Sequence, residues 1–197
     1  MKQQILFIHG GEPDMGYEKY LERLKNGWFS LNNKKPTKWY KNLRSILGEN
    51  NFEIITTKMP NPDNAFYNEW KIWFERHLEF LHDGIILVGH SLGGNFLAKY
   101  LAEEDFDIQI KQLHLVAPSH SAFEDDFKLK EFPGKLLEKN ISEIHIYHST
   151  DDTVVPLSES EKYHQQLPES HLHIFEDRFH FLDETFPELF ENIKKSL

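Results

Sequence analysis

The sequence contains no cysteine among its 197 residues. Disulfide bonds, thiolate metal sites and cysteine nucleophiles are therefore excluded. Long apolar runs are also missing, since only Ile5–Ile8 forms a continuous apolar stretch before His9. A signal peptide needs an apolar region of about 7–15 residues, and a membrane helix needs about 20. We therefore expect a cytoplasmic protein that does not insert into a membrane.

Positive charge is scarce relative to negative charge. Lys and Arg number 22 against 32 Asp and Glu, which gives a net charge of −10. Nucleic acids and anionic membranes attract proteins through clustered basic residues. An acidic chain without a clustered basic stripe is a poor candidate for either, so we expect no nucleic-acid partner and no membrane partner.

Apolar residues are plentiful, at 39% of the chain, and aromatic residues alone make up 14%. That composition is sufficient for a packed core and argues against disorder. A chain of this length suits one domain. We therefore predict a single domain over residues 1–197.

Short apolar runs alternate with longer stretches of helical periodicity. The runs are mostly continuous, as in strands that are covered on both faces. The predicted strands are Ile5–Ile8, Glu53–Thr57, Gly84–Val88, Lys111–Val116, Glu143–His148 and His171–Phe175. The predicted helices are Trp39–Leu47, Asn64–Leu81, Leu92–Ala102, Ser158–Leu167 and Phe186–Ile193. This alternation predicts an α/β fold, a compact and doubly wound, mostly parallel sheet of about six strands with helices on both faces.

Two segments are longer than this plan requires. Residues 14–36 follow the first strand and residues 119–140 follow the fourth. Ligands of open α/β sheets bind beyond the carboxyl ends of the strands. We therefore interpret both segments as possible lids, with surface insertions as the alternative.

The pentapeptide Gly89-His90-Ser91-Leu92-Gly93 has the pattern G-x-S-x-G. An apolar strand precedes it and an amphipathic helix follows it. In that setting the serine occupies a sharp turn that exposes its hydroxyl above the sheet, and small residues are needed on either side to avoid clashes. The pattern predicts that Ser91 is a nucleophile.

A nucleophilic serine needs a base, and 12 histidines are available. His180 follows the last predicted strand, which places it at the same edge of the sheet as Ser91. His171 and His173 alternate on a strand, but no carboxylate stands at a clear ligand spacing, so we predict no metal site. His180 is therefore the predicted base.

The base in turn needs an acid that fixes its tautomer. Asp151 and Asp152 both follow the fifth predicted strand, and we prefer Asp152, with Asp151 as the alternative acid. Either carboxylate could instead serve an Asx-type turn. Stabilisation of the developing oxyanion is predicted from the backbone N–H groups of Leu92 and Gly11.

These residues resemble a known family. The segments "FIHGG", "LVGHSLGG", "HSTDDTVVP" and "FHF" are similar to those of the small α/β-hydrolases of the retinoblastoma-binding-protein-9 type, over nearly the whole chain. The resemblance implies an α/β-hydrolase fold and a serine hydrolase, with Ser91, Asp152 and His180 in the catalytic positions. Two features depart from the family pattern: Phe179 stands where a glycine is common, and residues 14–36 are longer than usual.

We expect a carboxylesterase-like serine hydrolase that acts on a small ester through an acyl-enzyme and needs no cofactor. The same machinery would also suit an amidase, a peptidase or a thioesterase, because the fold does not separate these reactions. A third alternative is a non-catalytic hydrolase fold that binds a protein partner. The oligomeric state stays open, and a monomer is compatible with the sequence.

Overall fold

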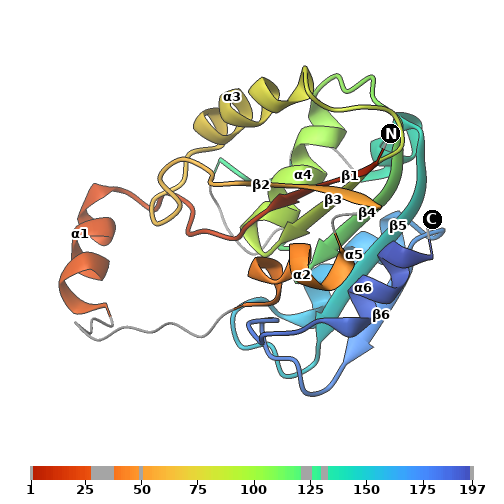
Figure 1. The fold of residues 1–197 in the computed structure, drawn as a ribbon. Helices are drawn as coiled ribbons and strands as arrows, with labels where there is room; N and C mark the ends of the chain where they lie inside the picture. Colours follow the sequence, from red (N-terminus) through yellow and green to blue (C-terminus); the bar gives the residue numbers. More distant parts are fainter. Residues whose placement is uncertain (1, 28–37, 49–50, 121–125, 130–132, 196–197) are drawn as a thin grey trace.

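The computed structural model describes residues 2–27, 38–48, 51–120, 126–129 and 133–195 (Figure 1). Within these residues one sheet has the strand order β2-β1-β3-β4-β5-β6, and every neighbouring pair is parallel. Its strands are β1 (Gln3–Ile8), β2 (Phe52–Thr57), β3 (Ile85–His90), β4 (Ile110–Val116), β5 (Ile141–Ser149) and β6 (His171–Phe175). The predicted α/β class and six-stranded sheet are confirmed, and the sheet is wholly parallel.

Helices cover both faces of the sheet. The described helices are α1 (Tyr17–Asn26), which stands apart, and η1 (Trp39–Lys41), α2 (Leu43–Leu47), α3 (Tyr67–Leu78), α4 (Leu92–Glu103), η2 (Pro133–Lys139), α5 (Leu157–Gln166) and α6 (Pro187–Lys194). Apolar side chains of α3, α4 and α5 build the core on one face, and those of η1, α2 and α6 build it on the other. The central strand β3 is buried along its whole length because both faces are covered.

The order of the strands places a crevice beside β3. The chain runs from β1 outward to β2 at one edge and then returns to β3 on the other side of β1. Loops that follow β1 and β3 therefore diverge at their carboxyl ends, which is where open α/β sheets bind their ligands. The segments "HGG" and "HSL" both leave the sheet at this point.

Two local predictions were wrong. The expected helix Trp39–Leu47 is divided at Asn42 into a 3₁₀ turn and a short α-helix. The expected helix Ser158–Leu167 begins instead at Leu157, directly after Pro156, and no side chain caps it. Pro156 has φ −69° and ψ 145°, an extended conformation that the fixed φ of proline permits directly before the helix.

The two predicted lids are described only in part, because residues 28–37, 121–125 and 130–132 lie outside the described residues. In the first segment, α1 buries no residue and stands away from the sheet (Figure 1). In the second, Phe127 and Leu136 are buried in the core beside α4. The lid role of either segment stays a prediction.

Candidate active site

Ser91 occupies a sharp turn between β3 and α4. Its backbone has φ 54° and ψ −124°, and α4 begins at the next residue, Leu92. A left-handed φ is uncommon for a residue with a side chain and marks stored strain, which is frequent at active sites. A Cβ on Gly89 would lie 2.6 Å from the Gly93 carbonyl oxygen, and one on Gly93 would collide with the Ile8 carbonyl oxygen. The turn therefore requires glycine on both sides, as the pattern predicted.

His180 belongs to the connection between β6 and α6, and two side chains hold the backbone there. His90 Nε2 donates to the His180 carbonyl oxygen at 2.8 Å, and Trp39 Nε1 donates to the Phe181 carbonyl oxygen at 3.0 Å. Burial, followed by the charge of His180, lowers the pKa of His90 to about 3. His90 is therefore a neutral donor at physiological pH. This anchoring role was missed from the sequence, where His90 is only one residue of the turn.

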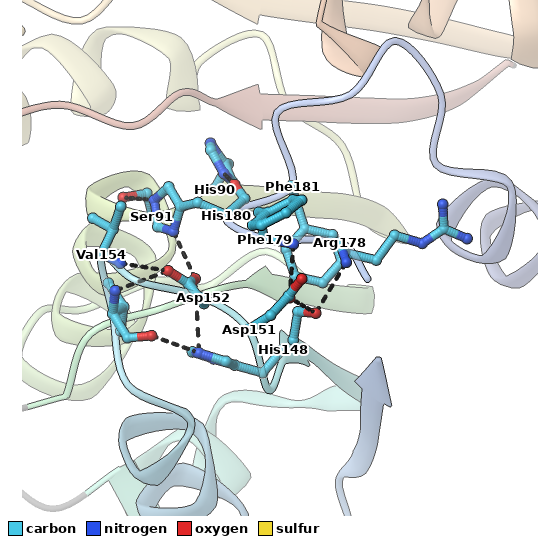
Figure 2. Close-up of polar contacts among 12 residues, drawn as sticks. His90, Ser91, His148, Asp151, Asp152, Val154, Arg178, Phe179, His180 and Phe181 are labelled. Carbon is cyan, nitrogen blue, oxygen red and sulfur yellow. Dashed lines mark hydrogen bonds and ion pairs between the residues drawn. The ribbon is translucent and has the colours of Figure 1, made fainter. Parts of the chain in front are cut away.

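The side chains of Ser91, His180 and Asp152 form one continuous hydrogen-bonded chain (Figure 2). His180 Nε2 lies 2.9 Å from Ser91 Oγ, and His180 Nδ1 lies 2.7 Å from Asp152 Oδ2. The Asp152 side chain is 0% exposed and that of His180 is 9% exposed. Since the carboxylate accepts from Nδ1, the other ring nitrogen is left without a proton and faces the hydroxyl. The geometry therefore suits proton transfer from Ser91.

The Asp152 carboxylate stays ionised despite its burial. Burial alone would raise its pKa, but the hydrogen bond from His180 and the amides of Val155 and Val154 outweigh that effect, so the pKa lies below its usual range. The amides of Val154 and Val155 donate to Oδ1 at 2.8 and 3.0 Å. Asp152 therefore forms an Asx-type turn with one oxygen and holds His180 with the other.

Asp151 points elsewhere. Its Oδ1 accepts from Ser149 Oγ at 2.5 Å and from the Phe179 amide at 2.9 Å. Asp151 thus joins the end of β5 to the loop that carries His180, and the structure brings Asp152 rather than Asp151 to the imidazole. Phe179 has φ 45° and is 61% exposed, so this position does adopt the left-handed conformation that favours glycine.

A cavity of about 470 Å³ opens beside Ser91. Ser91, Leu92 and Gly11 all line it, so the two residues predicted to supply oxyanion donors border the same cavity as the serine. Gly10 was missed as a site residue: a Cβ there would lie 3.0 Å from Ser91 Cβ. The loop after β1 can approach the serine this closely only because residue 10 has no side chain.

The sheet, the turn at Ser91 and its hydrogen-bonded partners define a protein of the α/β-hydrolase fold. The structure is similar to the crystal structure of the ydeN gene product from B. subtilis, with a TM-score of 0.79, 20% identity and coverage of 99% of this chain and 98% of that one. It is also similar to Est1E from Butyrivibrio proteoclasticus with bound ferulic acid, with a TM-score of 0.60, 17% identity and coverage of 98% and 87%. These likenesses confirm the predicted fold.

The sequence comparisons agree with the fold. Residues 26–192 match the family described as serine hydrolase. Serine hydrolase RBBP9 of Rattus norvegicus is 27% identical over 169 residues, which cover 81% of this chain and 86% of the relative. Putative hydrolase YdeN of Bacillus subtilis (strain 168) is 26% identical over 195 residues, covering 96% and 92%. The chain belongs to the serine hydrolase family.

Among the described helices, none is both long enough and apolar enough to cross a membrane. Within the same part of the chain, no three His, Asp or Glu side chains are grouped so that they could hold a metal ion.

Proposed function

We propose that this protein hydrolyses a small carboxylic ester through an acyl-enzyme on Ser91. The observation that carries the proposal is the hydrogen-bonded chain from Ser91 Oγ through His180 to Asp152 Oδ2, with distances of 2.9 and 2.7 Å. An unassisted hydroxyl is a poor nucleophile at neutral pH, and an adjacent oriented base activates it. Membership of the serine hydrolase family supports hydrolysis as the reaction type.

In the first half of the reaction, Ser91 Oγ attacks the acyl carbon of the ester while His180 Nε2 takes the hydroxyl proton. The bond to the alcohol oxygen then breaks, and His180 returns the proton to the leaving alcohol. Asp152 holds the imidazole and stabilises its protonated form. The products of this half are the free alcohol and an acyl group on Ser91.

In the second half, His180 takes a proton from water, which attacks the acyl carbon. The ester bond to Ser91 breaks, the serine regains its proton and the carboxylic acid leaves. Both tetrahedral intermediates carry an oxyanion. The amides of Leu92 and Gly11, with the amino-terminal end of α4, suit the binding of that oxyanion.

The cavity supports a small substrate. Its volume of about 470 Å³ lies in the lower part of the usual range for ligand sites. Val154, Val155 and Leu182 contribute apolar lining next to His180. These side chains suit the apolar portion of an ester, because burial of apolar surface is favourable whatever its detailed shape.

Labelling with a fluorophosphonate tests the proposal. This reagent attacks activated serines and adds a defined mass to the chain. Intact-mass spectrometry should show one adduct on the wild type and none on Ser91→Ala. Esters, thioesters and amides of equal acyl group would then be compared, and we expect the ester to be cleaved fastest. A folded wild-type protein without an adduct would contradict the proposal and favour a protein-binding module.

A further inference from the structure

A second imidazole lies beside the carboxylate of Asp152. His148, near the end of β5, places Nε2 3.8 Å from Asp152 Oδ2, and both side chains are 0% exposed. Figure 2 shows Asp152 between His148 and His180. His148 takes no direct part in the proposed hydrolysis.

Two hydrogen bonds fix the tautomer of His148. Nε2 lies 2.9 Å from the Val155 carbonyl oxygen, and Nδ1 lies 2.7 Å from Ser160 Oγ in α5. A carbonyl oxygen only accepts, so Nε2 carries the proton, and in the neutral ring Nδ1 accepts from the serine hydroxyl. Burial is the main cause that lowers the pKa of His148, which keeps the ring neutral near pH 7.

The charged groups around His148 are already engaged with other partners. Asp152 binds His180, and Glu159 is paired with Lys162 at 2.6 Å and accepts from the His120 amide at 2.9 Å. His148 is therefore not needed as a counter-ion for a free carboxylate. Its hydrogen bond to the Val155 carbonyl oxygen indicates instead that it holds the backbone in place.

The backbone that His148 holds is the same turn that holds Asp152. The Val155 carbonyl accepts from His148, while the Val155 amide donates to Asp152 Oδ1 at 3.0 Å. A continuous series of contacts therefore runs from Ser160 in α5 through His148 and Val155 to Asp152. Helix α5 and the end of β5 are thereby tied to the base.

We propose that His148 is a positioning residue that orients Asp152 toward His180 by fixing the turn at Val154–Val155. The proposal rests on the proposed function, since it assigns a role within the same site. Without the imidazole donor, the turn is free to move and the two amides lose their alignment with Asp152 Oδ1. The carboxylate then holds protonated His180 less well, which slows acyl transfer and moves the acid limb of the rate profile to lower pH.

Three variants and a control test this role. His148→Leu removes both hydrogen bonds, whereas His148→Gln keeps an amide donor at the position of Nε2. Ser160→Ala removes only the hydroxyl that bonds to Nδ1 of His148, and it is a milder change should His148→Leu fold poorly. His114→Leu is the control, because His114 is also 0% exposed but bonds to Tyr147 and Gln112, outside the cavity beside Ser91.

The readouts are kcat and KM for p-nitrophenyl acetate from pH 5 to pH 8, normalised to folded protein. We expect His148→Leu to lower kcat by about tenfold, the loss corresponding to one or two well-placed hydrogen bonds. KM should change little, and the acid limb should move to lower pH. His148→Gln should recover most of kcat, and Ser160→Ala should lose about two- to threefold, from one weaker bond.

A spectroscopic readout separates this proposal from the proposed function. The imidazole proton between His180 Nδ1 and Asp152 should give a low-field proton resonance at acidic pH. We expect His148→Leu to shift or broaden it and His148→Gln and His114→Leu to retain it. This readout needs no turnover, so it tests His148 even if the wild type takes up no phosphonate. The proposal is overturned if His148→Leu matches His114→Leu in kcat, acid limb and resonance.

Discussion

Histidines on the two faces of the sheet make different contacts. On the face covered by α5, His148 has one hydrogen-bond partner for each ring nitrogen. On the face covered by α6, His145 stacks on His114 and His171, with ring centroids 4.9 Å apart in both pairs. His145 Nδ1 also lies 3.1 Å from His173 Nε2, an arrangement that tolerates at most one proton between the two rings.

The two groups of histidines differ in the partners of their imidazole rings. The site histidines His90, His148 and His180 each bond to a carbonyl or a carboxylate in the turns around Ser91. The histidines of the α6 face stack mainly on one another. They are His114, His145, His171 and His173. We therefore expect the first group to control activity. Burial lowers the pKa of members of both groups, so both should reduce stability at acidic pH, and the second group should do so without affecting catalysis.

The largest effect should come from removing the base itself. His180→Ala should lower kcat/KM by at least about 10⁴-fold, because the serine then has no proton acceptor. His114→Ala should lower activity only in proportion to the loss of folded protein. Steady-state kinetics with p-nitrophenyl acetate and a denaturation curve for each variant check this pair. Equal losses of kcat/KM in the folded variants would remove the distinction between the two groups of histidines.

The next effect separates the two neighbouring acids. Asp152→Asn should lower kcat by about 10³- to 10⁴-fold, because an amide in place of the carboxylate favours the wrong tautomer of the base. Asp151→Asn keeps an acceptor oxygen for Ser149 Oγ and the Phe179 amide and only weakens these bonds by removing the charge, so we expect a loss of about tenfold or less. Comparison of kcat at pH 7.5 checks the order. A larger loss in Asp151→Asn would assign the acid to Asp151.

Stability should fall as the pH drops below about 6.5. Burial lowers the pKa of His114 and His145, and it lowers that of His173 to about 4. Above pH 6.5 these rings are neutral in both the folded and the unfolded chain. Below it the unfolded chain binds protons that the folded chain does not, so the free energy of unfolding decreases.

His173→Gln should flatten this decrease between pH 6.5 and pH 5. Urea denaturation at several pH values measures the slope, and this window lies above the range in which carboxylates such as Glu143 become protonated. Glu143, His171 and Lys195 also face the cluster and stay unchanged in the variant. An unaltered slope would mean that His173 does not contribute to the loss of stability at acidic pH.

The smallest effect concerns Phe179, whose φ of 45° is strained for a residue with a side chain. Phe179→Gly should change the free energy of unfolding by no more than about 1 kcal/mol, since the relieved strain offsets the added flexibility of the unfolded chain. The amide that binds Asp151 is retained. Thermal denaturation with an activity assay checks the expectation. A strong loss of activity would instead assign the exposed ring a contact with substrate.

Much of the fold followed from the sequence because continuous apolar runs mark strands buried on both faces. Ser91, Asp152 and His180 could be predicted because each follows a strand at one edge of the sheet. The break at Asn42 and the start of α5 depend on local backbone geometry that periodicity does not report. The roles of His90 and His148 could not be predicted from the sequence, because their partners lie in turns that only tertiary packing positions.

We have proposed that Ser91, activated by His180 and Asp152, forms an acyl-enzyme. Pre-steady-state release of p-nitrophenol from p-nitrophenyl acetate, combined with intact-mass detection of the acetylated chain, tests this step. We expect a burst of about one equivalent per chain in the wild type, with an acetyl group on Ser91 and neither signal in Ser91→Ala. Release without a burst or adduct, or an equal rate in Ser91→Ala, would contradict it.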